Sequence, residues 1–345
     1  MLRRTCLKLF VGAVAAMLFA PVARAEDKEL NLFAWSEYVP QAVIDGFTKE
    51  TGIKVNYETY ASNEEMLTKL LSGAAQYDLV QPSEYTIEAM VKKDLLSPLD
   101  KAKLPNIKNL APEFTKLGHD PEMKYCVTWM AGTVGIVVNT DKVKDDIKGY
   151  KDVFQPKFKG QIIALDDPRE LVSWVMNVKG IDINKVDDAA LNEVKPVLAE
   201  WMKYIKIYDS DSPKDKLEAG DVTLGVVWSG EAAKLYQKDK KFKYVLPVEG
   251  THLFIDSLAI PKGAPHKDNA HLFINYILRP EVSVLISKEF PYTNPNAEAR
   301  KLLSPEDLAN PASYPAGNPK MEIFHDIGKA SADIDKLVTD LKSGG

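Results

Sequence analysis

The chain has 345 residues, with 44 Lys or Arg against 49 Asp or Glu, so its formal net charge at neutral pH is −5. An acidic chain without a basic stripe argues against nucleic acid as a partner, and two cysteines are too few for a disulfide scaffold. The length suits one large or two medium domains.

The first 25 residues have the pattern of an export signal. A basic start (Arg3, Arg4, Lys8) precedes an apolar run over residues 9–20, and Ala23-Arg24-Ala25 is a small-x-small cleavage site. The apolar run is shorter than the roughly 20 residues that a membrane span needs. We therefore expect cleavage after Ala25 and an exported protein, with the general secretory and twin-arginine routes both open.

Cleavage would leave 320 residues and only one cysteine, Cys126, which excludes an internal disulfide. We interpret Cys126 as a small buried hydrophobe rather than a nucleophile. The export signal contains four basic residues and no acidic one, so its loss would change the formal net charge to −9.

Residues 30–40, L-N-L-F-A-W-S-E-Y-V-P, predict a buried strand, a turn and the start of a helix at Pro40. In open α/β sheets, ligands bind outside the carboxyl ends of the strands, where this turn lies. A carboxylate beside two aromatic faces suits a cation. The turn carries Trp35, Ser36, Glu37 and Tyr38.

The chain then alternates between strands and helices up to about residue 90. Strands are expected over 54–60 and 77–80, each followed by a helix, which implies a parallel sheet with right-handed crossovers. Ser83 and Tyr85 therefore fall at the same sheet edge as Trp35. Loops and short helices follow over 96–124, and a long apolar stretch over 125–139 has the character of a passage between domains.

A second set of strands and helices follows. Strands are predicted over 157–165, 206–208, 222–228, 244–247 and 252–260, and helices over 171–178, 191–205, 270–278 and 330–341. Two of these strands end in unusual polar sequences, D-D-P-R-E and W-S-G-E. They place Asp167, Glu170, Trp228 and Glu231 at strand ends. The pattern predicts two α/β lobes with a cleft between them.

Each of these residues also has an ordinary structural explanation. The two tryptophans fit a core, D-P-R-E fits a capping box at a helix start, and Glu231 fits the positive end of a helix dipole. Asp256 lies in an apolar strand and is costly to bury unless it is paired or caps a backbone turn. Together, however, the acids and aromatic rings would clamp an alkylammonium ligand.

These motifs resemble the periplasmic spermidine/putrescine-binding proteins of ABC transporters. The resemblance rests on W-S-E-Y-V-P, T-G-I-K-V, S-N-E, Y-D-L-V-Q-P-S, V-V-W-S-G, F-I-D-S-L-A-I-P, and N-P-N before A-R-K-L-L-S-P-E. It covers nearly the whole chain after residue 25, in order and with similar spacing.

The resemblance implies an α/β, two-lobed periplasmic binding protein fold of type II. Each lobe is then a mostly parallel sheet flanked by helices, and the hinge consists of crossing strands near Ile136 and Asp256. The implied first lobe is 26–135 plus 257–304, and the second is 136–256 plus 305–345. The resemblance further implies a monomeric receptor, without metal or cofactor, that binds putrescine or spermidine and delivers it to a membrane permease.

The resemblance also implies a set of ligand-binding residues. They are Trp35, Ser36, Glu37, Tyr38, Ser83, Tyr85, Asp167, Glu170, Trp228, Glu231, Phe254, Asp256 and Tyr292.

The resemblance leaves the ligand's length open. Phe254 and Glu231 are similar to putrescine-preferring members, whereas Tyr85 and the Asp167/Glu170 pair are similar to spermidine-preferring ones. A glutamine expected near the tail of spermidine binders is replaced by Phe324 or His325.

Two alternatives remain at this point. One is a periplasmic hydrolase that uses two of the acids as general acid and nucleophile, although the chain has neither an H-E-x-x-H nor a G-x-S-x-G motif. The other is a receptor of the same fold for a metal or an anion. The five histidines are scattered, which favours structural or exposed roles (His119, His252, His266, His271 and His325).

Overall fold

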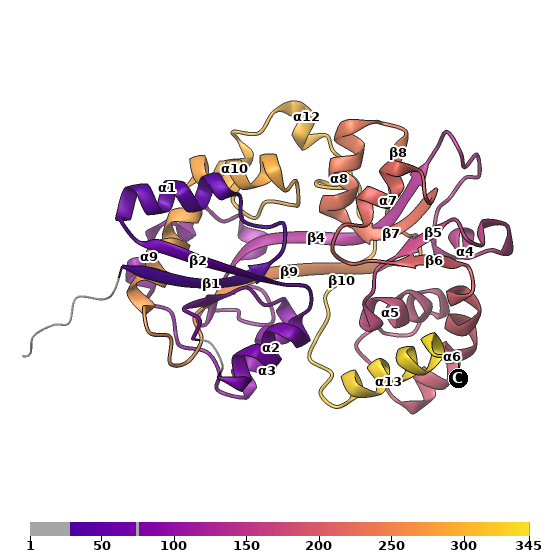
Figure 1. The fold of residues 1–345 in the computed structure, drawn as a ribbon, viewed down its shortest axis with the longest axis horizontal. Helices are drawn as coiled ribbons and strands as arrows, with labels where there is room; N and C mark the ends of the chain where they lie inside the picture. Colours follow the sequence, from indigo (N-terminus) through magenta and orange to yellow (C-terminus); the bar gives the residue numbers. More distant parts are fainter. Residues whose placement is uncertain (1–27, 74–75, 345) are drawn as a thin grey trace, which may run out of the picture.

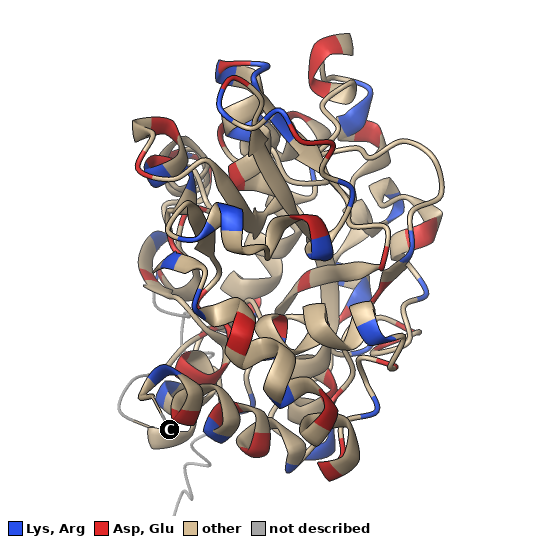
Figure 2. Cartoon of the chain, turned by 90° about the vertical axis from the view of Figure 1, so that its right-hand side faces the viewer, with Lys and Arg blue, Asp and Glu red and all other residues tan. Residues whose placement is uncertain are grey.

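The structure, a computed structural model, describes residues 28–73 and 76–344 (Figure 1). The export signal predicted over residues 1–25 lies outside this part of the chain. In the described part of the chain, each helix is too short or too polar to cross a membrane. Acidic and basic residues are interspersed along the ribbon (Figure 2).

The first half of the chain alternates strands with helices and then enters one long strand. Its elements are β1 (Glu29–Trp35), α1 (Gln41–Thr51), β2 (Lys54–Tyr60), α2 (Asn63–Ser72), β3 (Leu79–Val80), α3 (Glu84–Lys92), the short helices η1 (Lys101–Lys103), η2 (Pro105–Asn109) and η3 (Pro112–Phe114), and β4 (Cys126–Asn139).

The second half contains a further set of strands and a helical tail. Its elements are α4 (Tyr150–Val153), η4 (Pro156–Phe158), β5 (Ile162–Ala164), α5 (Pro168–Lys179), α6 (Asp188–Met202), β6 (Ile205–Tyr208), α7 (Pro213–Ala219), β7 (Leu224–Trp228), α8 (Ser229–Lys238), β8 (Phe242–Val245), β9 (Thr251–Ala259), α9 (Lys267–Ile277), α10 (Pro280–Glu289), α11 (Ala297–Arg300), α12 (Pro305–Leu308), β10 (Met321–Glu322) and α13 (Ala330–Lys342).

Two mostly parallel sheets are joined by a pair of crossing strands. The strand order is β2-β1-β3-β9-β4-β7-β5-β6. β1 runs parallel to β2 and β3, and β5 runs parallel to β6 and β7. β4 and β9 pair antiparallel and run from one half of the molecule into the other (Figure 1). The carboxyl ends of both parallel sheets therefore face the middle of the molecule.

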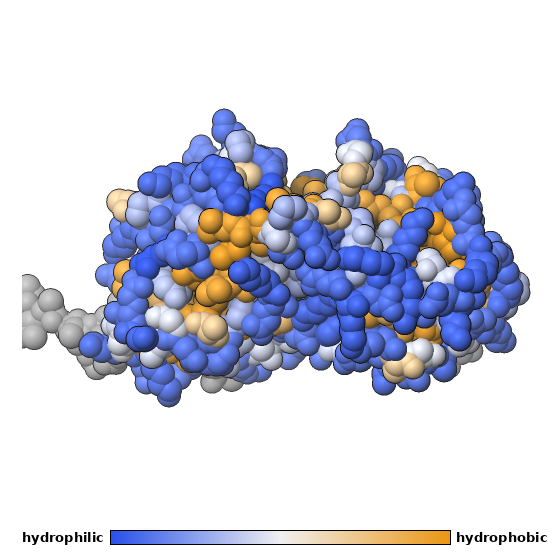
Figure 3. Space-filling view, turned by 90° about the horizontal axis from the view of Figure 1, so that it is seen from above, coloured by the Kyte–Doolittle hydropathy of each residue, from blue (hydrophilic) through white to orange (hydrophobic). Residues whose placement is uncertain are grey.

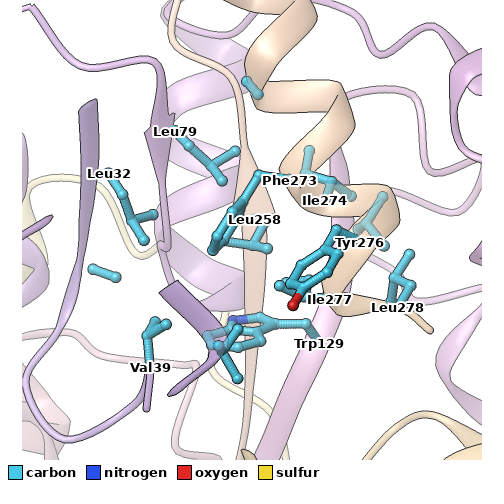
Figure 4. Close-up of a cluster of buried hydrophobic side chains, with 14 of the residues drawn as sticks. Leu32, Val39, Leu79, Trp129, Leu258, Phe273, Ile274, Tyr276, Ile277 and Leu278 are labelled. Carbon is cyan, nitrogen blue, oxygen red and sulfur yellow. The ribbon is translucent and has the colours of Figure 1, made fainter. Parts of the chain in front are cut away.

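A separate hydrophobic core supports each half. The core beside β1 packs Leu32 and Leu79 against Leu258 and residues of α9 (Figure 4). Within it, Phe47 contacts Phe273 edge-on at 5.1 Å between ring centroids. Burial of each such side chain contributes about 1.5–3 kcal/mol.

The other core is centred on Trp174, which stacks between Tyr150 and Phe154. Helix α13 packs on this core through Ile334 and Val338, although helices α9 and α10, which precede it in the chain, pack on the first core.

Short-range sequence signals set most element ends. Ser62 caps α2 by accepting a hydrogen bond from the Glu65 amide, and Gly52 ends α1 in a left-handed conformation. The strand predicted over 157–165 covers only 162–164, because Pro156 opens a short helix and Gly160 turns the chain at φ 75°.

One helix prediction also needs correction, and two helices of at least seven residues were not predicted. The helix predicted over 191–205 spans 188–202, since Asp187 caps its start through the Ala190 amide. Helices α7 and α10 were missed, although each begins with a proline, Pro213 and Pro280.

A substitution at Gly132, on β4, tests how tightly the crossing strands are packed. A β-carbon at this position would overlap the Phe254 ring and lie 2.6 Å from Ser229 Oγ. We expect Gly132→Ala to cost about 1–3 kcal/mol and to lower the melting temperature by several degrees, measured by calorimetry. Gly118→Ala is the control, since nothing lies within 4 Å of its added carbon. Equal melting temperatures for the two variants would contradict the packing described.

Candidate functional site

A cavity of about 720 Å³, partly open to solvent, is lined by residues from both halves. Seen from above, the surface of the molecule is indented between these halves (Figure 3). All thirteen residues that the sequence singled out line this one cavity. It is also lined by Ala61, Asn63, Arg169, Ser210, Asp211, His252 and Phe324.

The fold brings these residues together because they follow strand ends or start helices. Trp35 ends β1, Ser83 and Asp167 directly precede α3 and α5, and Trp228 directly precedes α8. Glu37 adopts a left-handed backbone at φ 54°, which is uncommon for a residue with a β-carbon. Such outliers persist where the surrounding structure fixes them, as in binding sites.

Asp256 lies on β9 and is 2% exposed. Its carboxylate accepts hydrogen bonds from Tyr38 Oη at 2.9 Å and Ser83 Oγ at 2.7 Å. Burial raises the pKa of Asp256 to about 7, against the effect of the two hydroxyl groups. Side chains, not a backbone turn, therefore hold this carboxylate within the described residues, and a cation in the cavity would stabilise its charged form.

Asp167 is the second lining carboxylate that forms no salt bridge within the described residues, although Arg169, which also lines the cavity, interacts with it electrostatically. It caps α5 by accepting a hydrogen bond from the Glu170 amide at 3.0 Å. Desolvation and the nearby charges of Glu170 and Glu64 raise the pKa of Asp167 to about 7. The capping-box interpretation is half right, because the Glu170 side chain turns away from the cap.

Glu170 instead belongs to a buried triad with His252 and Glu84. His252 Nδ1 lies 2.6 Å from Glu170 Oε1, and His252 Nε2 lies 2.9 Å from Glu84 Oε1. Burial alone would lower the pKa of His252, but the charges of Glu170 and Glu84 raise it to about 9. His252 is therefore an imidazolium at neutral pH, and it compensates the charge of Glu170. The Phe324 ring stacks on it, with centroids 3.7 Å apart.

Two further lining acids, Glu37 and Glu231, belong to an ion cluster that the sequence did not indicate. Lys214 Nζ lies 2.9 Å from Glu231 Oε2 and 3.0 Å from Glu37 Oε2, and Lys234 Nζ lies 3.0 Å from Glu37 Oε2. Burial alone would lower the pKa of Lys214, but the two carboxylates raise it above its ordinary value. Glu37 and Glu231 line the cavity as expected, but both already have ammonium partners.

Aromatic rings form the remaining walls. Trp228 meets Phe254 edge-on at 5.5 Å between centroids, and Phe254 meets Tyr292 at 5.8 Å. The indole of Trp228 is held by its hydrogen bond to the Ser210 carbonyl at 3.0 Å. Ser36 donates a hydrogen bond to Asp211, which connects the two halves across the opening. Such rings suit both methylene chains and cations.

A metal centre has no support in the described part of the chain. No group of three or more His, Cys, Asp or Glu residues there is arranged to hold an ion.

The buried triad predicts a dependence of stability on pH. Because folding raises the pKa of His252 from its ordinary 6.5 to about 9, its stabilisation is complete below pH 6.5 and is lost as the pH rises through 9. We expect the wild type to lose free energy of unfolding, on the order of 3 kcal/mol, between pH 6.5 and 9.5. His252→Gln should lose much less, as measured by urea denaturation. Parallel pH profiles for the two proteins would contradict the charge state assigned to His252.

Comparison with known proteins agrees with this architecture. The family described as "Bacterial extracellular solute-binding protein" matches residues 42–316. The spermidine/putrescine-binding periplasmic protein of Salmonella typhimurium is 37% identical over 343 residues, which cover 97% of each chain. The putrescine-binding periplasmic protein of Escherichia coli is 35% identical, covering 92% of this chain and 90% of that protein.

A solved structure shares the fold. The putative spermidine/putrescine ABC transporter protein of Listeria monocytogenes superposes with a TM-score of 0.88 at 33% identity, covering 92% of this chain and all of that one. The periplasmic binding protein fold expected from the sequence is thus confirmed. The chain belongs to the spermidine/putrescine-binding periplasmic proteins, a family of bacterial extracellular solute-binding proteins.

Proposed function

We propose that this protein captures a polyamine, putrescine or spermidine, outside the cytoplasm and delivers it to an ABC permease. Members of its family are solute-binding receptors and not enzymes, which removes the hydrolase alternative. The names of its relatives support a polyamine as the ligand class.

One observation carries the proposal: Asp256 and Asp167 line an aromatic cavity and form no salt bridge with a Lys, Arg or His among the described residues. A buried carboxylate without a counter-ion is costly, and two ammonium groups joined by methylenes would neutralise both at once. The methylenes would lie against Trp228 and Phe254. An anionic ligand would meet two further negative charges instead.

The remaining lining residues take supporting roles in this proposal. Tyr38 and Ser83 orient the Asp256 carboxylate through their hydrogen bonds. Trp35, Tyr85 and Tyr292 close the apolar walls. Four lining residues already have protein partners and would contribute to the shape of the site rather than pair with a ligand ammonium: Glu170, Glu37, Glu231 and Ser36.

Capture would proceed by hinge bending. We propose lobes of 26–135 plus 257–304 and 136–256 plus 305–345, with β4 and β9 as the crossing strands. The contacts Ser36–Asp211 and Glu37–Lys214 join side chains of opposite lobes, which fits a closed state. Further ion pairs join the same two sets of residues, among them Glu37–Lys234 and Lys92–Asp326, so opening would have to break several contacts. The closed form, acting as a monomer, would dock on the permease.

Replacing the central carboxylate or the aromatic plate should abolish tight binding. We expect Asp256→Asn and Trp228→Ala each to weaken putrescine and spermidine binding by about 100-fold or more, because a ligand ammonium would lose its partner or its ring face. Isothermal titration calorimetry measures the affinities, and thermal melting checks the fold. Asp94→Asn is the matched control, since Asp94 is exposed and does not belong to the cavity lining. Near-normal affinity in either site variant would refute the site.

Binding should strengthen as the pH rises through 7. Asp256 and Asp167 each have a pKa raised to about 7, whereas the amines of putrescine stay protonated below pH 9. Putrescine affinity should therefore increase at least about tenfold between pH 6 and pH 8, as the carboxylates ionise without the ligand. Calorimetry at both values measures the change. An affinity that is flat or falls over this range would show that neither carboxylate pairs with the ligand.

A further inference from the structure

We propose that Lys214 acts as a built-in ammonium that fills one end of the pocket, so that the protein selects a ligand with two positive charges over one with three. This inference rests on the proposed function and names the feature that limits its ligand. It assigns a specificity-determining role to a residue that does not itself line the cavity.

Lys214 lies at the start of α7, and the acids that it contacts belong to different elements. Its side chain is 15% exposed. Glu231 belongs to α8, which lies beside α7, and Glu37 belongs to the turn after β1 (Figure 1). One ammonium thus bridges two carboxylates that both line the cavity. Glu231 is only 5% exposed, and Lys214 offsets part of the cost of its buried charge, although burial still raises the pKa of Glu231 above its ordinary value.

A lysine side chain is chemically one end of a diaminoalkane: a primary ammonium at the end of a chain of methylenes. The ammonium of Lys214 occupies the position between Glu37 and Glu231 that a nitrogen of a longer polyamine would otherwise occupy. The two cannot occupy the same carboxylates together without like-charge repulsion in a poorly solvated site. Lys214 therefore competes with the ligand for this end of the pocket from a covalently fixed position.

The other acids of the cavity then set the number of ligand charges. Glu170 is compensated by His252, and Glu37 has Lys234 as a second partner. Lys234 is itself held over the Phe290 ring, 4.4 Å from its centroid. Among the buried or half-buried lining acids, this leaves only Asp167 and Asp256 without a salt bridge within the described residues. Arg169 also lines the cavity, but its guanidinium packs over the Phe324 ring, 4.4 Å from the centroid, and forms no salt bridge there with either carboxylate. Two carboxylates match a diamine, and a third ammonium would find no vacant acid.

Asp211 does not change this conclusion. Its carboxylate is exposed at the opening and accepts the hydroxyl of Ser36. An ammonium beside it would remain largely in water, where an ion pair contributes little.

Removal of the lysine ammonium tests the proposal. In the mature protein, Lys214→Met keeps the apolar stem and removes the charge, which leaves Glu231 unpaired and open to a ligand ammonium. Calorimetry with putrescine and spermidine should show that the wild type prefers putrescine. In the variant, the ratio of spermidine to putrescine affinity should rise at least about tenfold, the effect of one charge pair of about 1.4 kcal/mol.

Three further variants make the result specific. Lys216→Met, at an exposed position on the same helix, should leave the affinity ratio unchanged. The double variant Lys214→Met/Glu231→Gln should lose the gain in spermidine affinity, because the vacated carboxylate is gone. Lys214→Gln gives the same test with a polar side chain, and thermal melting identifies the variants that fold.

The outcomes separate this proposal from the proposed function. An unchanged affinity ratio in a folded Lys214 variant would overturn it, and so would an equal change for both ligands, which would mean that Lys214 only latches the lobes. A wild type that binds polyamines but prefers spermidine would also contradict it. If neither the wild type nor any variant binds either polyamine, the proposed function fails as well.

Discussion

The need to compensate a buried carboxylate explains most of this site. Asp256 lies on a strand shared by both halves and is shielded from water, and within the described residues its carboxylate accepts hydrogen bonds from two hydroxyl groups. Hydrogen bonds of this kind reduce the cost of a buried charge but do not remove it. The cavity therefore contains a carboxylate whose charge no protein cation within the described residues neutralises by a salt bridge. The aromatic walls favour a ligand cation that also carries apolar groups.

Three other acids that line the cavity are neutralised by cations of the protein itself. Glu170 is compensated by a buried imidazolium, and Glu37 and Glu231 share lysine ammonium groups. The pocket is thus divided into carboxylates that stabilise the protein and carboxylates that remain for a ligand. The number of carboxylates left for a ligand would set the number of ligand charges that the pocket accepts. Replacing one internal cation would therefore change which polyamine binds best.

Local sequence patterns predicted two α/β lobes and the polar residues at their strand ends, whereas Phe254 and Tyr292 were expected only from the resemblance to polyamine-binding proteins. Strand-helix alternation places polar residues at strand ends, and parallel strands bring those ends to one edge. The internal partners were not predictable in this way. Lys214 has the appearance of a solvated lysine on a short polar helix, and His252 lies 82 residues from Glu170 and 168 from Glu84. Their pairing depends on tertiary distances that no local pattern encodes. From the sequence, Phe324 was considered only as a possible replacement for a glutamine of spermidine binders. Its contact with His252 was not predicted, because it depends on the pairing of β10 with β9.

The protons released when a ligand binds report most directly on the two uncompensated carboxylates. Titration of the protein with putrescine at pH 6.5, in two buffers of different ionisation enthalpy, counts those protons. If Asp256 and Asp167 are largely protonated before binding and charged afterwards, roughly one to two protons leave per ligand. Binding that releases no protons, or takes protons up, would contradict the account.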